Sequence, residues 1–121
     1  MSEHEFWVFL EGLWKKGRVQ QVSCVINFDD PGFSAMAGYM QGHALLPQGH
    51  DLISEDDIVR MGSLLFRGEV SSKAKEAVLI ILAHYPSETA LTILTKYNLK
   101  PDKALEFFGR MALEECAIWN E

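Results

Sequence analysis

The chain has 121 residues, of which 48% are hydrophobic and 23% are charged, and its formal net charge is −6. These values are typical of one globular domain that buries its own core, and they exclude a disordered chain. The acidic balance also argues against an extended contact with nucleic acid, which needs a basic face.

The two cysteines, Cys24 and Cys116, have a spacing that matches no metal or redox motif. We expect both to be reduced; a single disulfide between them is the alternative. The acidic N-terminus, Met-Ser-Glu-His-Glu, leads into a helical pattern and is unlike a signal peptide. The apolar run at 77–83 is far shorter than the roughly 20 residues that cross a bilayer. We therefore expect a cytoplasmic protein with no membrane contact.

Residues 2–16 open with a helix signature. Ser2 can cap the first turn, Glu5 completes a capping box three residues later, and Gly17 is a natural end. Between them apolar side chains recur at helical spacing, namely Phe6, Phe9, Leu10, Leu13 and Trp14. The plain interpretation is that this stripe packs on the core. The alternative is that Trp7 and part of the stripe contact a partner, because Trp and Phe are enriched in interfaces.

Residues 18–28 fit two patterns. Val22, Cys24, Ile26 and Phe28 alternate as in a strand, whereas Val19, Val22 and Ile26 also fit a helix. No second strand is evident in the sequence, and a lone strand leaves its backbone groups without partners. We therefore favour a helix. If the segment is a strand, a second copy of the chain is its expected partner.

A helix is predicted after Asp30 and Pro31, which suit the N-cap and the first helical position. Its apolar face carries Phe33, Met36, Ala37 and Met40. Gly38 and Gly42 each weaken a helix by about 1 kcal/mol relative to Ala, unless their small size lets another helix approach closely. Residues 43–53 follow as a loop, with Pro47 and Gly49 as turn residues.

From Ser54 onward four helices are predicted, with their boundaries set by capping serines, glycines and prolines. They cover residues 54–67, 72–85, 87–97 and 101–119, with Asn98 as a left-handed C-terminal residue and Pro101 and Asp102 opening the last helix. The helix at about 73–85 is apolar on every side, so it must be covered on every side. A buried strand at 77–83 is the competing interpretation.

Ser54-Glu55 recurs as Ser87-Glu88, 33 residues later, and this offset aligns Ile58 with Leu91 and Met61 with Leu94. Residues 54–119 therefore resemble α-helical hairpin repeats of the HEAT type. The resemblance implies a binding scaffold without chemistry of its own. Chance similarity between two capped helix pairs remains the alternative.

His43, His50 and Asp51 form the best polar group for a metal, since imidazole and carboxylate ligate zinc and similar ions. A solvated loop is the plainer interpretation of the same residues. His84 ends the central helix, where a structural role is expected. Glu114 and Glu115 are candidates for a pair of carboxylates in acid–base chemistry, but adjacent residues of a helix do not face each other. No nucleophilic or phosphate-binding motif is present.

The sequence thus predicts one all-α domain over residues 1–121, an array of five or six antiparallel helices around the 73–85 helix. The leading functional hypothesis is a non-enzymatic protein–protein interaction module, with a protein partner or a homodimer, no cofactor, no catalytic residues and no nucleic acid. The candidate interaction surface contains Trp7, Trp14, Phe33, Met36, Tyr39, Met40 and Trp119. The alternative is a small metal- or ligand-binding enzyme that uses the loop with His43, His50 and Asp51.

Overall fold

The computed structural model describes residues 1–17 and 33–120, and of residues 33–36 it describes the backbone only. The described part folds into six α-helices: α1 (Glu3–Trp14), α2 (Phe33–Gly42), α3 (Glu55–Ser63), α4 (Ser72–Ala83), α5 (Glu88–Tyr97) and α6 (Glu106–Trp119). Four single 3₁₀ turns supplement them: η1 (His43–Leu45), η2 (His50–Leu52), η3 (Leu64–Phe66) and η4 (Lys103–Leu105). The all-α prediction is confirmed for these residues. The ambiguous segment 18–28 and the expected helix start at Asp30 and Pro31 lie outside them.

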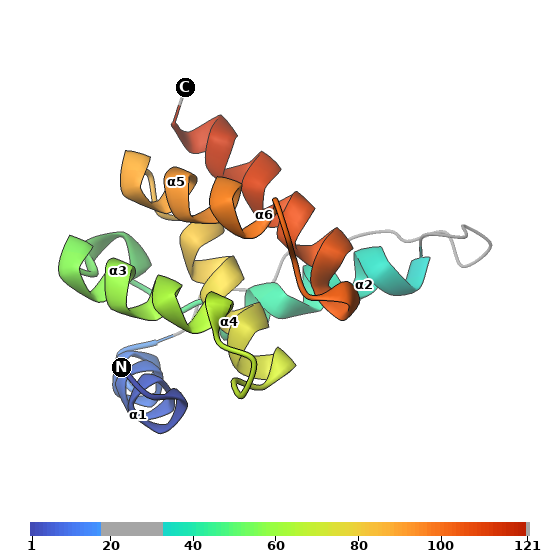
Figure 1. Ribbon diagram of the computed structural model, residues 1–121. Coiled ribbons are helices and arrows are strands. Elements are labelled where there is room, and N and C mark those ends of the chain that lie inside the picture. Colours follow the sequence, from blue (N-terminus) through green and yellow to red (C-terminus); the bar gives the residue numbers. More distant parts are fainter. Residues whose placement is uncertain (18–32, 121) are drawn as a thin grey trace.

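The apolar helix α4 is the centre of the array (Figure 1). From Ala77 to Ala83 no side chain is more than 1% exposed. Helices α1, α2, α3, α5 and α6 all contact α4, so every side of it is covered by the same chain. The prediction of a central buried helix is confirmed, and the competing strand at 77–83 is wrong.

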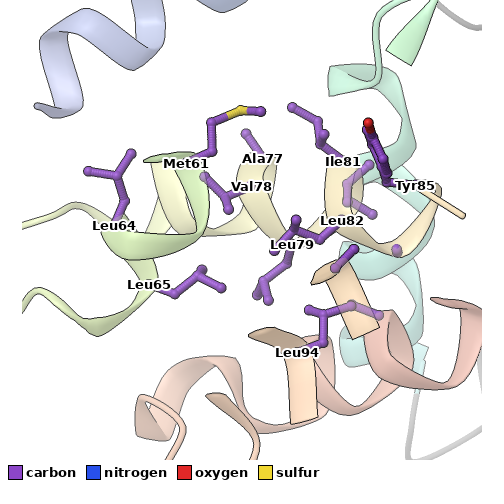
Figure 2. Packing of buried hydrophobic residues seen from close by; sticks show 14 of the residues in the cluster. Met61, Leu64, Leu65, Ala77, Val78, Leu79, Ile81, Leu82, Tyr85 and Leu94 are labelled. Atoms are coloured by element: carbon purple, nitrogen blue, oxygen red, sulfur yellow. The ribbon is translucent and has the colours of Figure 1, made fainter. Parts of the chain in front are cut away.

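The packing around α4 joins elements that are distant in sequence. Figure 2 shows Leu79 of α4 between Leu65 of η3 and Leu94 of α5, and Val78 of α4 beside Met61 of α3. Each of these side chains is almost fully buried. Burial of a leucine or valine side chain contributes about 1.5–3 kcal/mol, so this cluster is a major source of stability.

Four helices begin at the serines that the sequence predicts or at a direct neighbour. Ser2 forms the full capping box with Glu5, and Ser54, Ser71 and Ser87 each accept a hydrogen bond from the backbone N–H three residues later. Each such cap satisfies one of the N–H groups that a helix start leaves free. The expected end at Gly17 also holds, because this residue has a positive φ of 127° and its N–H donates to the Trp14 carbonyl.

At two predicted boundaries the polar side chain does not have the expected local role, because it binds groups elsewhere in the chain. Asn98 does not adopt the left-handed conformation (φ −72°); its side-chain amide donates to the carbonyls of Leu94 and Gly109 instead. Asp102 is the N-cap of the 3₁₀ turn η4, which leads directly into α6 at Glu106, but its side chain makes no capping hydrogen bond. Its carboxylate instead accepts hydrogen bonds from Lys75 and Tyr97.

The helices of the C-terminal part contact one another as two stacked hairpins would. α3 packs on α5 and α4 packs on α6, so the first helices of the two pairs are neighbours and so are the second helices. Within the described ranges, no helix has the length and apolar character needed to cross a membrane.

Candidate metal centre

Two helices end immediately before a histidine, and both histidines lie at one site. His43 follows Gly42, the last residue of α2, and His84 follows Ala83, the last residue of α4. The two rings are in edge-to-face contact, with centroids 4.9 Å apart at 84°. The C-terminal end of a helix carries partial negative charge. Two such ends meeting here therefore favour a cation.

Each histidine uses one ring nitrogen to fix its orientation. Nδ1 of His43 lies 3.0 Å from the carbonyl oxygen of Tyr39, and Nδ1 of His84 lies 2.9 Å from that of Ile80. In both cases the carbonyl belongs to the residue four positions earlier. Because a carbonyl only accepts, both Nδ1 atoms carry a proton and both Nε2 atoms face away from their helices.

The two Nε2 atoms face the same carboxylate, that of Glu115 in α6. His43 Nε2 lies 3.2 Å from Oε1 of Glu115, and His84 Nε2 lies 2.8 Å from Oε2. The Tyr39 hydroxyl donates a short hydrogen bond to Oε1 of the same carboxylate. The ring of Tyr39 is itself held edge-to-face between His43 and Phe108. The carboxylate is thus fixed from three sides.

The electrostatics of the site favour an ionised Glu115 with positive charge beside it. Burial acts to raise the pKa of Glu115, but hydrogen bonds from His43, His84 and Tyr39 outweigh it and hold this pKa well below its usual range. The hydrogen bond to Glu115 raises the pKa of His43 against the opposing effect of burial. Burial, followed by the Glu115 hydrogen bond, raises the pKa of Tyr39, which therefore stays protonated.

His43, His84 and Glu115 form a set of potential metal ligands. One ligand atom from each lies within 4.8 Å of the other two. Tetrahedral zinc with bonds of about 2.0–2.1 Å places its ligand atoms about 3.3 Å apart. The two histidines now contact different oxygens of Glu115, at 3.2 and 2.8 Å, so a small movement of the side chains would bring one oxygen and both nitrogens to this spacing. Two histidines and one glutamate are a known zinc ligand set, and Nδ1–H bonds to carbonyls are the usual support for ligating histidines.

The loop predicted at 43–53 is held against the rest of the chain. Trp14 Nε1 donates to the carbonyl of Leu45 at 2.8 Å, and the Gln48 N–H donates to the carbonyl of Gly17 at 3.0 Å. At the far end, the Tyr85 hydroxyl donates to the carbonyl of Ile53 at 2.5 Å. These contacts bring His50 beside His84, with ring centroids 6.0 Å apart.

The predicted metal group is therefore divided in the structure. His43 belongs to the three-residue set, and His50 lies next to it. Asp51 is exposed. Among the described residues, the carboxylate that lies with His43 and His84 is that of Glu115. The neighbouring Glu114 is exposed, as expected for adjacent positions on a helix.

The candidate interaction residues have several different environments. Tyr39 is buried at the metal set, whereas Trp7 and Trp14 pack partly buried against the core and contact each other. Met40 is half-buried, and Trp119 at the end of α6 is 57% exposed. The side chains of Phe33 and Met36 lie outside the described part.

Sequence reasoning considered Glu115 only together with Glu114 and did not connect it with the histidines. It also missed the hydroxyl of Tyr39 and gave His84 only a structural role. The three ligands are 41 and 31 positions apart, so no local spacing connects them. One signal was available, which is that His43 follows Gly42 and His84 precedes Tyr85-Pro86, so both histidines stand where a helix is expected to stop.

Cys116 is a free thiol buried beside this region, and it donates to the carbonyl of Tyr85 at 3.8 Å. Burial raises its pKa to about 11, which makes it a poor thiolate and a poor nucleophile. Cys24 lies outside the described residues.

Comparison with known proteins gives no relative: no family model, no curated protein and no solved structure matches this chain.

Proposed function

We propose that this protein binds one divalent transition-metal ion, zinc in the first instance, through Nε2 of His43, Nε2 of His84 and a carboxylate oxygen of Glu115. The observation that carries the proposal is the shared orientation of the two histidines. Both Nδ1–H groups are bound to backbone carbonyls, so both Nε2 atoms are directed at one ionised carboxylate. This is the arrangement that supports ligating histidines in metal sites.

The competing explanation is that protons occupy the place of the metal. In that case both histidines carry a charge and donate to Glu115 as two ion pairs. The converging ends of α2 and α4 favour either cation. A divalent ion has the advantage of satisfying all three side chains at once, without placing two imidazolium rings in edge contact.

Zinc titration of the purified full chain, followed by calorimetry and by thermal melting, tests the proposal. We expect one equivalent of Zn²⁺ to bind. At free Zn²⁺ about 100 times the Kd, the folded state should gain about 2.7 kcal/mol. For a chain of this size that corresponds to a rise in Tm of roughly 10 °C.

The chain supplies matched controls for this experiment. Glu115→Gln and His84→Ala should abolish the stabilisation, whereas Glu114→Gln and His4→Ala, which change exposed side chains of the same type, should leave it unchanged. Wild-type protein whose melting does not respond to Zn²⁺, or equal responses from Glu114→Gln and Glu115→Gln, would refute the metal site.

The interaction module predicted from the sequence is retained as a second candidate because of one specific observation. An open groove of about 530 Å³ lies between α3 and α5, and Val59, Phe66 and Ile93 give it an apolar lining. Contiguous apolar surface of this kind is typical of contact sites. Light scattering can check the predicted self-association, and a cytoplasmic location likewise remains a prediction.

A further inference from the structure

Nδ1 of His50 is a buried polar atom. It is shielded from solvent and has no hydrogen-bond partner in the part of the chain that the structure describes. A buried polar atom without a partner costs about 1–3 kcal/mol, so native proteins rarely keep one without a reason. Coordination of a metal ion is one such reason.

The ring of His50 lies next to the proposed metal ligands. The three rings form a row in which His84 is flanked by His43 at 4.9 Å and by His50 at 6.0 Å, both in edge-to-face geometry. The row is fixed at its ends by α2, which leads into His43, and by the hydrogen bond from Tyr85 to Ile53.

The backbone before His50 forms a turn that places this residue next to His84. Gly49 adopts a left-handed conformation with φ 74°, and η2 begins at the next residue. Since this conformation suits glycine, the turn holds His50 in place without strain. The ring lies outside the set of ligand atoms within 4.8 Å, so it must rotate about its side-chain bonds to reach a common ion.

On this basis we propose that His50 is the fourth ligand, so that the complete centre is formed by His43, His50, His84 and Glu115. This inference rests on the proposed metal-binding function. It also specifies the kind of site. Four protein ligands around zinc make a closed site, whereas catalytic zinc sites keep one position for water or substrate. The ion would fix the 43–53 segment onto α4 and α6 and would take no part in hydrolysis.

Nitrogen-15 NMR of the imidazole rings in wild-type protein tests this without a variant. The chain has four histidines, and the fourth, His4, is exposed on α1 and serves as an internal control. On addition of one equivalent of Zn²⁺, we expect the ring signals of His43, His50 and His84 to shift while those of His4 stay in place. Shifts of His43 and His84 alone would overturn the role of His50 and leave the metal site intact. If no ring responds, the metal site and this inference both fail.

A substitution of His50 measures how much this residue contributes to the affinity for Zn²⁺. His50→Gln should bind Zn²⁺ at least tenfold more weakly than wild type, as determined by competition with a chromophoric chelator, and His4→Gln should bind as wild type does. A Kd for His50→Gln within twofold of the wild-type value would overturn the inference. Melting of both variants without metal shows whether they fold, and the ring NMR decides the question if His50→Gln does not.

Discussion

At the scale of single residues, the ion pair between Lys75 and Asp102 shows how one carboxylate can stabilise a buried charge. The Lys75 side chain is only 4% exposed, and its Nζ lies 2.9 Å from Oδ2 of Asp102, whose side chain is 42% exposed. The same oxygen accepts a hydrogen bond from the Tyr97 hydroxyl at 2.7 Å. Hydrogen bonds from Tyr97 and then Lys75 lower the pKa of Asp102 below its ordinary value of 3.8.

Asp102→Asn should therefore reduce stability in a pH-dependent way. Loss of one partner from a fully buried pair costs about 3–5 kcal/mol, and we expect roughly 2 kcal/mol here because Asp102 is partly in water. A carboxyl whose pKa is lower in the folded state contributes stability above its unfolded pKa of 3.8, and that contribution is lost as the pH falls through the folded value.

Urea unfolding of wild type and variant measures this contribution. At about pH 7 the difference in unfolding free energy between the two proteins should have its full value, and it should shrink as the pH falls below 3.8 and through the lower folded-state pKa of Asp102. A difference that stays constant over this acid range would show that Asp102 does not act through its charge.

At the scale of elements, two glycines of α2 have opposite surroundings. A Cβ added to Gly42 would lie 2.9 Å from Cζ of Phe108 in α6, whereas one added to Gly38 would meet nothing within 4 Å. Neither glycine has a positive φ. Gly42 therefore allows α2 and α6 to approach closely next to His43, and Gly38 only weakens its helix.

The two alanine substitutions should therefore have opposite signs. Gly38→Ala should stabilise by up to about 1 kcal/mol, because alanine favours the helix. Gly42→Ala gains the same preference but overpacks a buried ring, which costs about 1–3 kcal/mol, so a net loss is expected. Thermal melting of the two variants beside wild type gives the comparison, and a Gly42→Ala protein as stable as Gly38→Ala would contradict the close packing.

The element scale is also where sequence reasoning succeeded best, because helix signals are local. A helix can be predicted from a few neighbouring residues at several places: at Ser2 with Glu5, at Ser54, at Ser87 and at the apolar run 77–83. Sequence reasoning failed where a polar side chain binds residues that are distant in the sequence. Asp102 holds the N-cap position of η4, but its carboxylate binds Lys75, 27 positions away, instead of the backbone of the turn. Glu115 could be assigned to the site only once α6 was placed beside α4.

At the scale of the whole molecule, α4 couples all the other helices, so the described fold should unfold as one unit. α1 is the most peripheral helix in Figure 1, yet the Glu3 carboxylate accepts hydrogen bonds from the backbone and hydroxyl of Ser71, the N-cap of α4, at 2.8 Å each. Phe6 and Leu10 of α1 are fully buried in the common core. Loss of packing around α4 should therefore release α1 as well.

Leu79→Ala, with Leu99→Ala as its control, tests this coupling. Leu79 is 0% exposed in the middle of α4, and Leu99 is 81% exposed after α5. The buried substitution should cost about 2–5 kcal/mol, and the exposed one should stay within about 0.5 kcal/mol of wild type. With Trp119 of α6 replaced by Phe, the remaining tryptophans, Trp7 and Trp14, report on α1, while far-UV circular dichroism reports on all helices. In Leu79→Ala on this background, the two signals should change at the same denaturant concentration. A tryptophan transition that precedes the loss of helix would show that α1 unfolds independently of α4.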